Sequence, residues 1–68
     1  MTATIIETLI AERKRRGWSQ REVVRQLGVS SSSVWNWERG NVDPTLGNLA
    51  AWAAVLGYSL ALTSEAAS

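Results

Sequence analysis

The side chains best suited to chemistry in this sequence are a group of cations, a run of serines and one amide. Six of the seven basic residues fall between positions 13 and 25, against the single acid Glu22: Arg13, Lys14, Arg15, Arg16, Arg21 and Arg25. Clustered cations attract anions such as phosphate. Ser30 to Ser33 then precede Asn36, whose amide can both donate and accept hydrogen bonds. Charge alone is equally consistent with a solvated helix face, since the net charge is only +1.

The composition argues against an enzyme. The sequence has no histidine and no cysteine, and its few carboxylates show neither the spacing of a metal site nor a paired arrangement for acid–base work. We therefore expect no cofactor and no metal. Its 68 residues make one domain with a thin core. No apolar run approaches the roughly 20 residues that a membrane span needs, so we expect no membrane partner and a cytoplasmic protein.

Helix start and stop signals divide the first half of the chain. Apolar residues at helical spacing, from Ile5 to Ile10, predict a helix over about residues 3–16 that Gly17 ends. Ser19, with Glu22 three positions later, forms a capping-box pattern at the start of a second helix. This helix covers about residues 19–27 and ends at Gly28.

Two further helices follow. Ser30 is the expected N-cap of a third helix over about residues 30–39, which Gly40 ends. Thr45 is the expected cap of a fourth helix over about residues 46–56. The apolar face of that helix contains Leu46, Leu49, Trp52, Ala53 and Leu56. Spacing places Trp37 and Trp52 in the core, Trp18 partly in it, and Trp35 away from it.

The C-terminal residues show a different pattern. After Gly57, apolar side chains alternate with small or polar ones, which favours a strand over residues 58–63. A short helical turn that covers the core is the alternative, and the sequence leaves it open. Residues 64–68 are small and polar, so we expect a frayed tail. The predicted division is thus a helical domain over residues 1–57, the segment 58–63 and the tail.

Two short helices joined by a tight glycine-containing turn describe a helix-turn-helix. The chain resembles the Cro and phage-repressor (Xre-like) helix-turn-helix family in Gly17-Trp18-Ser19-Gln20, Leu27-Gly28-Val29-Ser30, Val34, Trp37-Glu38-Arg39-Gly40 and Pro44. The resemblance implies an all-α, compact four-helix fold of the lambda-repressor type. The alternating pattern after Gly57 adds a short C-terminal strand, or a terminal helical turn, used in dimerisation, because a lone strand would leave its backbone groups unpaired. In this family the third helix enters the major groove and the second lies across the DNA backbone.

The resemblance also assigns roles to individual residues. The expected base contacts are Ser31, Ser32, Ser33, Trp35 and Asn36; the amide of Asn36 suits adenine best. The expected phosphate contacts are Gln20, Arg21, Arg39 and Asn41. Arg13 and Glu38 match positions that form a buried ion pair in several family members. For Trp35 and for each phosphate contact, a plain surface role stays open.

The function implied is sequence-specific regulation of transcription. We expect a repressor that binds an inverted-repeat operator in double-stranded DNA as a homodimer, paired through Tyr58, Leu60 and Leu62. The resemblance implies a prokaryotic or phage-encoded protein associated with the nucleoid. An antitoxin that binds a toxin protein as well as its own operator is the alternative. The operator sequence, and repression as opposed to activation, stay open.

Overall fold

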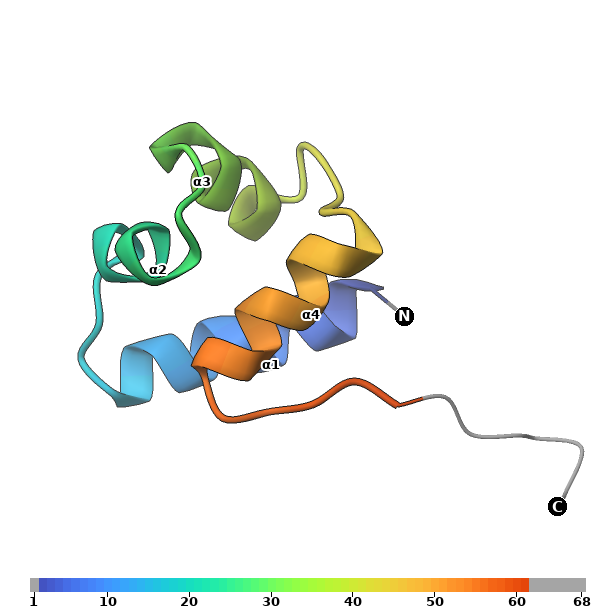
Figure 1. Cartoon of the computed structure of the whole chain (residues 1–68), viewed down its shortest axis with the longest axis horizontal. Coiled ribbons are helices and arrows are strands. Elements are labelled where there is room, and N and C mark those ends of the chain that lie inside the picture. Colours follow the sequence, from blue (N-terminus) through green and yellow to red (C-terminus); the bar gives the residue numbers. More distant parts are fainter. Residues whose placement is uncertain (1, 62–68) are drawn as a thin grey trace, which may run out of the picture.

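The computed structural model describes residues 2–61 and shows four helices (Figure 1). They are α1 (Thr2–Arg15), α2 (Gln20–Leu27), α3 (Ser31–Arg39) and α4 (Leu46–Val55). Helices α2 and α3 lie side by side, and α1 and α4 are drawn below them in Figure 1. Helix α2 also contacts α4, and α1 contacts α3. The described residues contain no strand, which confirms the predicted all-α, lambda-repressor-like class.

The helix ends lie within one or two residues of those predicted. Ser19 caps α2, because its hydroxyl accepts a hydrogen bond from the backbone N–H of Glu22 at 3.2 Å. Thr45 caps α4 in the same way, accepting from the backbone N–H of Asn48 at 3.1 Å. Gly28, with a φ of 71°, ends α2 in the left-handed conformation that glycine adopts at low cost. Local signals of this kind therefore set the element boundaries.

One buried cluster joins all four helices. Its members are Ile6, Leu9, Val23, Val34, Trp37, Leu49, Trp52, Ala53 and Leu56. The rings of Trp37 and Trp52 pack at the centre with their centroids 5.5 Å apart, so both predicted core tryptophans are confirmed. Trp18 is half-buried against this cluster, also as predicted.

Leu46 is a correction to the predicted core. Its side chain is 76% exposed, although it continues the apolar stripe of α4. Side chains on a helix lean toward its N-terminus. Because Leu46 is the first residue of α4, its side chain extends past the end of the helix and beyond the packed core.

The segment after α4 has no regular secondary structure over Tyr58–Ala61. In Figure 1 it runs beneath α1 and α4. Leu60 packs against the core, while Tyr58 is 45% exposed. The single chain therefore shows neither the strand nor the helical turn in these four residues. Pairing of two such segments requires a second subunit and stays a prediction, and residues 62–68, including Leu62, lie outside the described residues.

Candidate nucleic-acid interface

The outward face of α3 carries the candidate base contacts. Val34 and Trp37 are buried, which fixes the rotation of the helix about its axis. At about 100° per residue, Ser32, Trp35, Asn36 and Arg39 then face away from the core. Ser31, Ser32 and Trp35 are exposed, whereas Ser33 and Asn36 are half-buried. The predicted base-contact residues thus lie on one accessible surface, with Ser33 at its margin.

The serines at the start of α3 bond to one another rather than to the backbone. Ser30 occupies the N-cap position, but its side chain makes no cap hydrogen bond. Its hydroxyl instead lies 2.8 Å from that of Ser33 and 3.3 Å from that of Ser32. The N-terminus of α3 therefore has no side-chain cap; the Ser33 N–H donates to the Ser30 backbone oxygen, and the N–H groups before it are left to water or an anion.

Asn36 and Asn41 also lie together. The side-chain amide nitrogen of Asn41 donates to the side-chain oxygen of Asn36 at 3.2 Å. This contact leaves the Asn36 amide nitrogen free to donate, and its oxygen keeps a second lone pair. Asn36 therefore retains one donor and one acceptor for a base edge, and the hydrogen bond from Asn41 holds its amide in one orientation.

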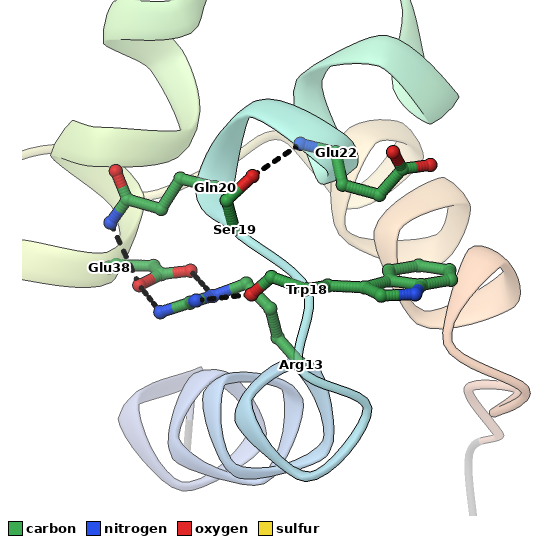
Figure 2. Close-up of polar contacts among 6 residues, drawn as sticks. All are labelled: Arg13, Trp18, Ser19, Gln20, Glu22 and Glu38. Carbon is green, nitrogen blue, oxygen red and sulfur yellow. Dashed lines mark hydrogen bonds and ion pairs between the residues drawn. The ribbon is translucent and has the colours of Figure 1, made fainter.

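A polar network beneath this surface ties three parts of the fold together (Figure 2). The Nε and Nη2 atoms of Arg13 donate to the two carboxylate oxygens of Glu38 at 2.8 and 2.9 Å. The Nη1 atom of Arg13 donates to the backbone oxygen of Trp18 at 2.8 Å. The two charged side chains are only 11% and 7% exposed. The structure thus brings together the predicted ion pair, which links α1 to α3 and to the turn before α2.

Gln20 joins the same network, which the sequence did not indicate. Its side-chain nitrogen donates to Oε1 of Glu38 at 3.0 Å (Figure 2). One N–H of the amide is therefore occupied, and the second remains available to a phosphate oxygen. The sequence signal for this contact is weak: Gln20 is a polar residue at the start of α2, and Glu38 is an acid on the following helix, α3.

Ion pairing divides the cation cluster into two groups. Arg15 and Arg16 both bond to Glu12, and Arg25 bonds to Glu22. Hydrogen bonds from Arg15 and Arg16 lower the pKa of Glu12 to about 2, and the bond from Arg25 lowers the pKa of Glu22. With Arg13 held by Glu38, the cations that have no carboxylate partner within the described residues are Lys14, Arg21 and Arg39. The sequence stretch is therefore less available to phosphate than its composition suggests.

The free arginines flank the exposed face of α3. Arg21 lines an open groove of about 320 Å³ between α2 and α3, together with Gln20, Ser31 and Trp35. The guanidinium of Arg39 lies over the indole ring of Trp35, 4.6 Å from its centroid. Candidate phosphate contacts from α2 and from the end of α3 thus lie close to the candidate base contacts, an arrangement that suits the edge of a DNA groove.

The described residues contain no group of three or more metal-ligating side chains. None of the described helices has the length and apolar character needed to cross a bilayer.

Comparison with known families agrees with this geometry. The model of the family described as "Helix-turn-helix" matches residues 9–62, which includes α2, α3 and α4. No curated protein and no solved structure matches the chain. Because the family match covers most of the sequence, the chain belongs to the helix-turn-helix family of the Xre, Cro and lambda-repressor type, whose members are DNA-binding transcription regulators.

Proposed function

We propose that the protein is a sequence-specific repressor that binds an inverted-repeat operator as a homodimer, with α3 of each subunit in the major groove. The observation that carries the proposal is the outward face of α3, where exposed and half-buried polar side chains lie near Arg21 and Arg39, two arginines that have no carboxylate partner within residues 2–61. A helix with its side chains is about 10–12 Å across, which fits the major groove of about 12 Å.

The phosphate contacts in this proposal lie at the two edges of the surface. Gln20 and Arg21 open α2, where the helix dipole also favours an anion. Arg39 and Asn41 lie at and just after the end of α3. Contacts of this kind fix the position of the protein on the duplex and do not depend on its sequence.

Asn36 is the base contact that the geometry supports best. It keeps a donor and an acceptor free and is oriented by Asn41, as bidentate pairing with adenine requires. Ser31, Ser32 and Ser33 add hydroxyls that tolerate more than one base. Few strong base contacts imply that DNA shape supplies part of the specificity.

A dimer completes the proposal, because an inverted repeat presents two equivalent half-sites. Tyr58 is a large side chain left 45% exposed, next to Leu60 on the segment after α4. Leu60 itself packs against the core of its own subunit, so Tyr58 is the cleaner probe of pairing. In sedimentation experiments, Tyr58→Ser should weaken self-association while the neighbouring exposed Ser59→Ala should not. Equal dimerisation of both variants would contradict pairing through this segment.

Two alanine variants test the division between base and phosphate contacts. Asn36→Ala should lose about 1–3 kcal/mol on the preferred duplex and relax the preference at one base pair. Gln20→Ala should weaken binding to preferred and unrelated duplexes by the same factor. Gln26→Ala, on the exposed part of the same helix α2, is the matched control for Gln20. Uniform losses in both test variants would overturn the assignment of Asn36.

A further inference from the structure

We infer that Trp35 acts on DNA through Arg39: the indole holds the guanidinium in place for a backbone phosphate, so that Trp35 is a positioning residue. The inference rests on the proposed function, since it concerns the same surface. The two side chains are four residues apart on α3 and therefore lie on the same face. Their 4.6 Å separation is within the range of cation–π contact.

The stack leaves the hydrogen-bonding groups of Arg39 unused. Four other arginines have a carboxylate partner: Arg13, Arg15, Arg16 and Arg25. Arg39 makes no side-chain hydrogen bond or ion pair within residues 2–61, and the ring of Trp35 offers no acceptor in the plane of the guanidinium. Its N–H donors, which lie in that plane, can therefore all be used by a phosphate, whose oxygens suit a forked donor.

The stack of Arg16 on Trp18 offers a comparison, because its guanidinium also makes hydrogen bonds within the fold. Arg16 lies 5.1 Å from the centroid of the Trp18 ring. It also donates to Glu12 at 2.8 Å and to the backbone oxygen of Leu56 at 3.0 Å. That guanidinium is hydrogen-bonded inside the fold, whereas the guanidinium of Arg39 lies on the indole and has no hydrogen-bond partner within residues 2–61. A side chain that is positioned by a stack and keeps its donors free is what a preformed anion contact requires.

The surroundings of Trp35 also favour phosphate over a base. Its indole is 46% exposed and lines the groove that Gln20 and Arg21 share. The ring thus adjoins phosphate-binding candidates on α2 and carries Arg39 on its own helix. Because Arg39 covers the indole, less of the ring is left to meet a thymine methyl group.

The test is a double-mutant cycle in DNA binding. Wild type, Trp35→Leu, Arg39→Gln and the double variant are titrated against two probes. The first is the duplex recovered by selection from random DNA, and the second is a duplex of unrelated sequence. Both substituted side chains are exposed, so the variants should fold. Trp35→Phe, which keeps an aromatic face, is the matched control. Proton NMR of the free protein monitors the Arg39 side chain, whose resonances an overlying ring shifts upfield.

We expect Trp35→Leu to weaken binding about two- to fivefold per half-site, the size of an exposed cation–π contact. The loss should be equal on both probes, and Trp35→Phe should retain most of the affinity. In the Arg39→Gln background, Trp35→Leu should cause no further loss of affinity. In the single variant Trp35→Leu, the upfield shift of the Arg39 resonances should disappear.

Other results would overturn the inference. A loss that persists undiminished without Arg39, and that is confined to the selected duplex, would make Trp35 a direct base contact. Equal affinity of Trp35→Leu and wild type would remove any role for the stack. If the wild-type protein bound neither duplex while the ring-current shift was present, the proposed function would fail with the stack intact.

Discussion

Removing one partner of the Arg13–Glu38 ion pair should strongly destabilise the fold, because the other charge is then left buried without a partner. The pair makes two parallel hydrogen bonds, and each side chain is about nine-tenths buried. A charge left without its partner at such a site costs about 3–5 kcal/mol. A domain of 68 residues has a total stability of roughly 3–10 kcal/mol. Either single substitution therefore removes a large share of the stability.

The cycle uses Arg13→Met, Glu38→Leu and the double variant, with urea denaturation followed by circular dichroism. Apolar side chains of similar length replace the charges without leaving a cavity. The double variant strands no charge, so it should be more stable than the sum of the single losses predicts, by about 2 kcal/mol or more. Gln20→Ala removes only one hydrogen bond to Glu38 and should cost about 1 kcal/mol.

Additive single losses would refute this account of the pair. A coupling energy near zero means that each charge is solvated independently, which is incompatible with a bidentate contact shielded from water. If a single variant is unfolded without denaturant, Arg13→Lys is measured in its place. Lysine keeps the positive charge but cannot make the bidentate contact with Glu38. Arg13→Lys should lose less stability than Arg13→Met.

Three further predictions concern the cations and their partners. With Arg21 and Arg39 as the free arginines at the surface, a dimer neutralising about four phosphates should lose about 150-fold in affinity between 50 and 200 mM salt. A loss above a thousandfold would mean that further cations, Lys14 or the paired arginines, also contact DNA. Arg16→Ala should destabilise by about 1–2 kcal/mol, because it removes the donor to the Leu56 carbonyl, whereas Arg15→Ala, at an exposed side chain, should leave the stability nearly unchanged. The Glu12 carboxyl should titrate near pH 2 by NMR, so its contribution to stability is complete above about pH 4.5 and is lost as the pH falls toward 2; titration near 4.5 would show that the arginine contacts do not persist.

Local chemistry explains how much of the fold the sequence predicts. Ser19 and Thr45 cap α2 and α4 as expected, and Gly28 and Gly40 end α2 and α3 in the left-handed conformation. These signals act within a few residues, so they can be recognised without tertiary information. Ser30 is the exception, since its hydroxyl bonds to neighbouring serines rather than to the backbone. A serine run offers several equivalent partners, and sequence does not choose among them.

The candidate site is less predictable because its properties depend on three-dimensional neighbours. Six cations close together in sequence suggest one basic surface, yet four of them are ion-paired, and Arg15 and Arg16 share the single negative charge of Glu12. The spacing of three and four residues from Glu12 contained that information. The contact of Gln20 with Glu38 joins different helices, and the stack of Arg39 on Trp35 depends on side-chain rotamers. Neither follows from residue type alone.

Selection of bound duplexes from a random pool shows whether two copies of α3 bind an inverted repeat. We expect the recovered duplexes to contain two half-sites in inverted orientation, with centres about one helical turn, or about 34 Å, apart. Asn36→Ala should relax the same position in both half-sites. Recovery of no common sequence, or of a single half-site bound by one subunit, would show that the protein does not bind DNA in this way.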